Sequence, residues 1–142
     1  MIHIPIEEKF GWYKTGRAGT KFCQVYDEAV GAVLKTNSSV ALRLLFWVMK
    51  KMDSSNIVRL RGGEKRDFIY ECGGGISISA VNRGVQVLVA EGIMIPTSVA
   101  GNRGGEYFVN PYLFWKENSQ IDRKQRIIEF HDLLNLKEYE EN

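Results

Sequence analysis

The stretch that most constrains the fold is residues 75–92, GISISAVNRGVQVLVAEG. Ser77 can cap the first turn of a helix there, because its hydroxyl oxygen accepts backbone N–H groups that lack a partner inside the helix. An apolar stripe follows at helical spacing, formed by Val81, Val85, Leu88 and Gly92. The opposite face carries side chains that hydrogen-bond, namely Ser79, Asn82, Arg83 and Gln86. The pattern predicts a helix with one side in a core and the other side open to a partner.

The polar side of this helix suits DNA. Serine, asparagine, glutamine and arginine are the side chains that hydrogen-bond to base edges in a major groove. An ordinary surface helix also has a polar outside, so the stretch alone fits both interpretations. Ser77 and Ile78 at the start of the helix are further candidate DNA contacts, as are Lys65 and Arg66 in the helix expected before it.

The segments before this helix are predicted from their periodicity. Residues 40–52 form the clearest helix, and its core stripe is Leu44, Leu45, Val48 and Met52, with Phe46 and Trp47 counted as core aromatics. Residues 57–60 fit a short strand that Arg61-Gly62-Gly63 breaks, and residues 64–72 fit a two-turn helix. Residues 73–75 are glycines that predict a tight turn. Residues 22–34 begin like a strand and end like a helix, and the pattern does not decide between the two.

A β-hairpin is predicted after the helix. Residues 93–99 and 106–110 fit two strands, and the loop GNRGG joins them. At its tip, Asn102 and Arg103 could meet phosphate, or the arginine could be incidental. The order helix, strand, helix, turn, helix, hairpin is that of a winged helix-turn-helix. We therefore expect an α+β fold with a three-helix core, a β-hairpin wing and a C-terminal helix.

The two ends of the chain flank this domain, which we place at residues 22–118. Residues 1–21 are expected to form an N-terminal strand with Ile2, Ile4 and Ile6, then a flexible basic arm with Lys14, Arg17 and Lys21 that is either a solvated loop or a DNA contact. In the C-terminal part, 119–142, a helix is expected over 122–139. Its apolar line, with neighbours, is Ile127, Ile128, Phe130, Leu133, Leu134 and Lys137. That line must be buried on the domain or on a second copy, and we favour a homodimer because a two-fold protein matches a two-fold DNA site.

Composition limits the function classes. The net charge of +2 and pI of about 8.5 are modest for a nucleic-acid protein, but residues 36–63 carry a local +4 and residues 127–142 a local −4. Cys23 and Cys72 form no CxxC, and His3 and His131 complete no metal spacing, so we expect no metal or disulfide and a cytoplasmic protein. The N-terminus does not match a signal peptide, and no apolar run could span a membrane. No GxxxxGK[ST] or GxSxG is present, so we expect neither a cofactor nor enzyme activity.

One segment resembles a known family. The run YFVNPYLFWK, residues 107–116, with the expected helices and hairpin, resembles the RepL-type plasmid replication proteins of Gram-positive bacteria, over roughly residues 20–130. The pattern GIS-x-x-x-V-x-R-x-x-x-x-L-x-x-x-GI, residues 75–93, is similar to the recognition helix of that family and the strand behind it. The resemblance implies a replication initiator that binds double-stranded origin DNA and recruits host replication proteins, without catalysis. The alternatives are a winged-helix regulator that binds an operator, and a winged helix used for protein–protein contact.

Overall fold

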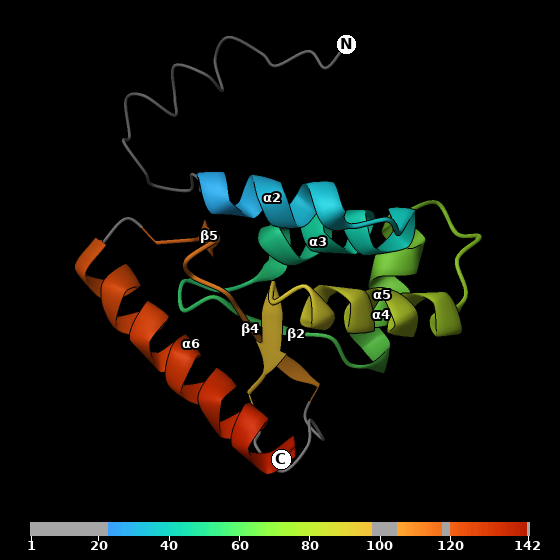
Figure 1. The fold of residues 1–142 in the computed structure, drawn as a ribbon. Coiled ribbons are helices and arrows are strands. Elements are labelled where there is room, and N and C mark those ends of the chain that lie inside the picture. The colour runs from blue at the N-terminus through green and yellow to red at the C-terminus, as the bar shows by residue number, and fades with distance from the viewer. Residues whose placement is uncertain (1–22, 98–104, 118–119, 142) are drawn as a thin grey trace, which may run out of the picture.

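The structure is a computed structural model that describes residues 23–97, 105–117 and 120–141. Within these residues the chain is α+β, with five helices and two small antiparallel sheets (Figure 1). The helices are α2 (Asp27–Lys35), α3 (Ser39–Lys51), α4 (Gly62–Glu71), α5 (Ile78–Ala90) and α6 (Gln120–Glu141). The strands are β1 (Gln24–Val25), β2 (Ile57–Arg59), β3 (Met94–Pro96), β4 (Glu106–Val109) and β5 (Phe114–Trp115). Residues 22–34, where the pattern left strand and helix open, therefore hold β1 and most of α2.

The three-stranded sheet has the order β2-β4-β3 and separates two apolar layers. Side chains alternate across a strand, so neighbours on β4 point to opposite faces. Val109 belongs to the main core between the sheet and the helices, whereas Phe108 packs with Phe130 of α6 on the other face. Figure 1 shows α6 along one side of the sheet and the remaining helices on the other. This arrangement is compatible with the expected winged helix-turn-helix.

The main core lies where α3 and α5 pack on each other. Its largest fully buried side chains include Leu44, Leu45, Val48, Phe68, Val81 and Leu88. The predicted core stripe of residues 40–52 is thus confirmed, and Trp47 is also buried. Phe46 is not, because it lies on the outward side of α3 with two thirds (66%) of its surface exposed, so its assignment to the core is wrong.

The start of α4 also differs from the prediction. Gly62 and Gly63 do not break the chain but form the first turn of the helix. The Glu64 carboxylate accepts a hydrogen bond from the backbone N–H of Arg61 at 3.0 Å. This bond satisfies an N–H at the start of the helix, which stabilises a beginning that glycine alone would disfavour.

The turn and cap before α5 are confirmed. Gly73, Gly74 and Gly75 have φ of 86°, 82° and 81°, a region that favours glycine. The Ser77 hydroxyl accepts from the backbone N–H of Ala80 at 3.1 Å. Gly92 is not part of the helical stripe, because α5 ends at Ala90 and Gly92 has φ of 74° in the turn that follows.

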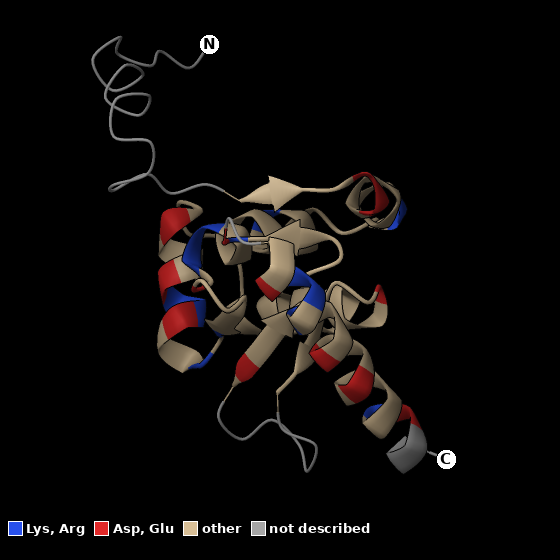
Figure 2. Cartoon of the chain, turned by 90° about the vertical axis from the view of Figure 1, so that its left-hand side faces the viewer, with Lys and Arg blue, Asp and Glu red and all other residues tan. Residues whose placement is uncertain are grey.

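The last helix runs from Gln120 to Glu141, longer than the predicted 122–139. Phe130 is buried on the sheet, and Leu133 and Leu134 pack beside it, so this part of the apolar line is buried on the chain's own domain. Ile128 lies outside that contact and is 54% exposed. Figure 2 shows that the charged residues toward the C-terminal end of α6 are mostly acidic.

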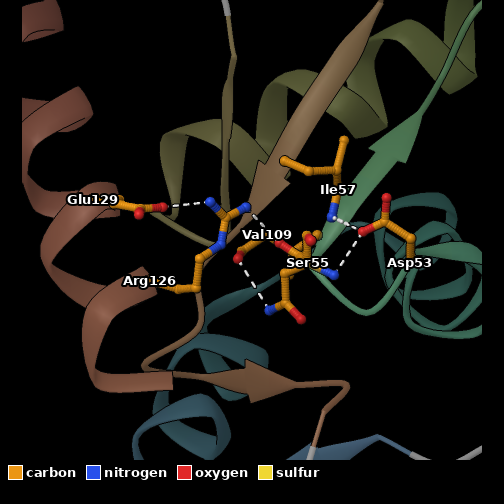
Figure 3. Close-up of polar contacts among 7 residues, drawn as sticks. Asp53, Ser55, Ile57, Val109, Arg126 and Glu129 are labelled. Atoms are coloured by element: carbon orange, nitrogen blue, oxygen red, sulfur yellow. Dashed lines mark hydrogen bonds and ion pairs between the residues drawn. The ribbon is translucent and has the colours of Figure 1, made fainter. Parts of the chain in front are cut away.

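Arg126 ties α6 to the turn before β2 (Figure 3). Its guanidinium pairs with Glu129, donates to the carbonyl of Ser55 at 2.7 Å and lies over the Phe108 ring at 4.3 Å. In the same turn, the Asp53 carboxylate accepts from the backbone N–H groups of Ser55 and Ile57 (2.8 and 3.0 Å). The turn and the helix that covers the sheet are therefore held as one unit.

The segment of residues 107–116 is part of the scaffold. The Asn110 side-chain amide donates to the carbonyl of Gly92 at 3.1 Å, which joins the end of β4 to the end of α5. Phe114 and Trp115 are each 1% exposed. The Lys116 ammonium donates to the carbonyls of Met49 and Lys50 (2.6 and 3.2 Å), where a cation is favourable at a helix C-terminus.

A buried asparagine joins this segment to β2. Asn56 is fully buried, has φ of 63°, and donates through its side-chain amide to the carbonyls of Val109 and Phe114 at 3.2 and 2.7 Å. Its side-chain oxygen accepts from the backbone N–H of Lys116 at 3.2 Å. Three strands thus meet at one amide, and every polar atom of that side chain has a backbone partner.

Several expectations concern other positions. The N-terminal strand and arm, residues 1–21, and the hairpin tip with Asn102 and Arg103 lie outside the described residues. Cys23 and Cys72 are half-buried free thiols packed against the core, as expected of small core residues. Burial raises the pKa of Cys23, which keeps that thiol protonated near neutral pH. Among the described helices, none has the length and apolar character needed to span a membrane.

Candidate nucleic-acid interface

The outward face of α5 is open to solvent along most of the helix. The four residues assigned to the polar face from the sequence and the two candidate contacts at the start of the helix are all exposed, namely Ser79, Asn82, Arg83, Gln86, Ser77 and Ile78. Within the described part of the chain, no hydrogen bond or ion pair engages the side chains of Asn82, Arg83 or Gln86. We call these six residues the α5 face. The α5 face offers several side-chain donors and acceptors on one surface.

The inner side of the same helix is fixed in place. Val81, Gly84 and Leu88 are buried against the core. The helix α5 packs on α3 with Gly84 against Ala41. A Cβ built on Gly84 would lie 3.5 Å from the backbone of Ala41, so the two helices are in close contact at this point. Ile76, just before the Ser77 cap, packs against the same core. The α5 face is therefore presented by a helix that has no freedom to rotate without unpacking the core.

The charge on the α5 face is positive. Arg83 is its one ionised side chain, and the only carboxylate between Ser77 and the end of the helix is Glu91, at the C-cap. A polyanion approaching the first three turns would therefore meet a cation and dipolar groups without like-charge repulsion. The exposed N-terminus of α5 adds the positive end of the helix dipole on the same side.

Lys65 and Arg66 lie on α4 and not on the α5 face. Arg66 is exposed and Lys65 is half-buried. No hydrogen bond or ion pair in the described residues joins either of them to α5. Their neighbour Glu64 accepts a hydrogen bond from the backbone N–H of Arg61, and Asp67 follows Arg66 on the same helix.

Two arginines that the sequence pattern did not predict as contacts lie beside Glu106, at the end of β4 nearest the hairpin loop. We call this place the hairpin root. Arg59 ends β2, and both it and Arg61 lie within 4.0 Å of the Glu106 carboxylate across the sheet. The backbone N–H of Leu60, between them, donates to the carbonyl of Gly105 at 2.6 Å. Both arginine side chains are exposed and reach the same carboxylate. The signal in the sequence was the period-two spacing of RLR after a short strand, which places both arginines on one side of it.

One hollow, of about 700 Å³, lies away from the α5 face. Its lining includes Trp47, Arg59, Glu64, Glu106 and Arg126. Positive and negative groups alternate around it, and Glu64 and Glu106 already have partners within the chain. In the described ranges no three His, Cys, Asp or Glu side chains gather as a metal site would require.

Comparison with known proteins gives no relative. The sequence matches no family model and no characterised protein, and the fold matches no solved structure at a significant level.

Proposed function

We propose that this protein is a winged helix-turn-helix that binds double-stranded DNA in a sequence-specific manner, with α5 as its recognition helix. The observation that carries the proposal is the α5 face, where the side chains of Asn82, Arg83 and Gln86 have no internal partner among the described residues, on a helix whose other side is packed in the core. The order α3-β2-α4-α5-β3-β4 and the sheet order β2-β4-β3 support the winged-helix assignment.

The chemistry of the α5 face suggests how bases would be distinguished. Asn82 and Gln86 carry amides that can bind the two adjacent groups on the major-groove edge of adenine, and Arg83 can bind guanine in the same bidentate way. Arg59 and Arg61 at the hairpin root would meet phosphates, which position the protein without contributing sequence information. Asn102 and Arg103 at the hairpin tip, with Lys65 and Arg66 on α4, are proposed as further backbone contacts.

Among DNA-binding roles we propose initiation of plasmid replication, in which the protein binds origin DNA and recruits host replication proteins. This role is supported by the resemblance of residues 107–116 and 75–93 to the RepL-type family. A transcriptional regulator that binds an operator would have the same interface. The two roles differ in their outcome in the cell, because loss of an initiator must lower plasmid copy number, so an intact copy number after deletion of the gene would exclude the initiator role.

The experiment that tests DNA binding is selection from a random-sequence duplex library, followed by titration of the selected duplex at increasing salt. We expect one sequence family to be enriched and log K to fall linearly with log salt, because phosphate contacts release counterions. A matched variant, Arg59→Gln with Arg61→Gln, should reduce the slope by roughly two. Enrichment of no sequence and no binding at low salt would contradict the proposal.

A second candidate function, protein–protein contact through α6, is favoured by one observation. Ile121, Ile128 and Leu136 are 82%, 54% and 52% exposed, on a helix whose other side already covers the sheet. These side chains could contact a second copy in the proposed homodimer. Sedimentation of the protein alone, compared with an Ile121→Ser and Ile128→Ser double variant, distinguishes the cases: a dimer that the double variant abolishes supports this contact, and a wild-type monomer contradicts it.

A further inference from the structure

The α5 face contains one residue whose side chain has no group that can form a hydrogen bond. Ile78, the first residue of α5, is 42% exposed and is the only large apolar residue on this fully described helix that points outward. Ile78 is three residues from Val81 and seven from Val85, so it lies at the edge of the buried stripe of α5 and continues that stripe into the first turn. An isoleucine also forms helix less readily than alanine at an exposed position. The exposed part of the Ile78 side chain is therefore not used by the core and is available to a partner.

The position of Ile78 beside the amides of Asn82 and Gln86 indicates what that partner would present. Ile78, Asn82 and Gln86 are spaced by four residues, so they lie in one row along α5. Each step of four residues advances about 6 Å along the helix axis. Base pairs are stacked about 3.4 Å apart, so a group at Ile78 would lie about two base-pair steps from a group at Asn82 when the helix follows the groove. The apolar group that base pairs present in the major groove is the C5-methyl of thymine.

We propose that Ile78 is a specificity-determining residue that packs on the C5-methyl group of a thymine, about two base pairs from the base that Asn82 contacts. This inference rests on the proposed function. It adds that the preferred duplex has a thymine at a fixed position and that its methyl group, not a hydrogen bond, is recognised there. Loss of one methyl group from an apolar contact weakens binding about fourfold.

The test uses the duplex that the wild-type protein selects from a random library. Each thymine is replaced in turn by deoxyuridine, which keeps the base-pairing edge and removes only the methyl group. We expect one replacement to weaken wild-type binding about fourfold. The Ile78→Ala protein should bind the thymine and uracil duplexes equally at that position, and Ile78→Val should keep most of the discrimination. Leu34→Ala, which removes a 78% exposed aliphatic side chain from α2, is the matched control and should behave as wild type.

Two results would overturn the inference while leaving DNA binding intact. The first is a selected duplex on which no uracil replacement weakens wild-type binding. The second is an Ile78→Ala protein that loses affinity at the same uracil position as fully as wild type, which would assign the methyl contact to another residue. If the wild-type protein selects no sequence at all, the proposed function fails and the inference fails with it.

Discussion

Two segments distinguish this chain, and the structure uses them in opposite ways. On the α5 face, Asn82, Arg83 and Gln86 have no hydrogen-bonding or ionic partner among the described residues. In residues 110–116, the Asn110 amide joins β4 to α5, Trp115 is buried, and the Lys116 ammonium caps α3. The fold uses these side chains of the second segment, whereas Asn82, Arg83 and Gln86 have no internal role.

The two segments therefore differ in what their side chains do for the protein. Side chains of residues 107–116 hold the scaffold together, so changes in that segment should act first on the fold. The α5 face contributes little to the fold, so it is where a partner would be recognised. Variants in the two segments should therefore have effects that differ in kind, on stability in one case and on binding in the other.

The largest effect is expected for Trp115→Ala. Removing a fully buried indole leaves a cavity next to β1, which should lower the free energy of unfolding by about 3–5 kcal/mol. Urea denaturation followed by circular dichroism measures it. Tyr112→Ala is the control in the same segment, because its side chain is 43% exposed and its loss should cost about 1 kcal/mol or less. Equal losses for the two variants would contradict the scaffold role of Trp115.

The second-largest loss of stability is expected at Asn56. Two variants separate the contribution of its side-chain hydrogen bonds from that of its positive φ. Asn56→Gly keeps a residue that tolerates positive φ but removes three side-chain hydrogen bonds, so it should cost about 2–3 kcal/mol. Asn56→Ala should cost about 1 kcal/mol more, because alanine is strained at this φ. The same denaturation experiment measures both. Alanine no worse than glycine would mean that the backbone conformation of Asn56 contributes nothing to stability.

On the α5 face the expected loss is in binding only. Asn82→Ala and Arg83→Ala should each weaken binding of the selected duplex by about 1–3 kcal/mol and relax its sequence preference. Because both side chains are exposed, the free energy of unfolding should change by less than about 0.5 kcal/mol. Fluorescence anisotropy and denaturation on the same preparations measure the two quantities. Wild-type affinity in both variants would remove α5 as the recognition helix.

The smallest effect is expected at Gly84, on the buried side of α5 where it packs against α3. A Cβ there would make ordinary contacts at 3.5 Å with Ala41, and alanine is the better helix former. Gly84→Ala should therefore raise the free energy of unfolding by about 0.5–1 kcal/mol and leave DNA affinity unchanged. Gly84→Leu, which has no room against Ala41, is the opposing variant and should destabilise the protein. A destabilised Gly84→Ala would show that the two helices tolerate no added atom.

Local patterns predicted those parts of the fold whose determinants are local in sequence. The Ser77 cap, the glycine turn and the buried stripe of residues 40–52 each depend on residues within a few positions of one another. The start of α4 was missed because Glu64 reaches back to the Arg61 N–H, a bond that outweighs the two glycines. The exposure of Phe46 was missed because residue type indicates burial only on average. The role of Arg126 was not foreseeable, because its partners at Ser55 and Phe108 are distant in sequence.

The candidate interface was predictable for the same reason, since the exposed positions of one amphipathic helix follow from its own spacing. The arginines at the hairpin root were harder to identify. Arg59 and Arg61 become neighbours of Glu106 only when β2 pairs with β4, and the strand register that brings them together depends on residues nearly fifty positions apart.

The glycines at 73, 74 and 75 have a consequence for any survey of tolerated substitutions. All three are exposed, and a Cβ at any of them would touch nothing within 4 Å, yet each has a φ that other residues adopt only under strain. A saturation mutagenesis map would therefore show an intolerant surface site directly beside the α5 face. The cause would be the positive φ at these three positions, which strains any residue with a side chain. Intolerance at these positions would therefore not be evidence for a ligand.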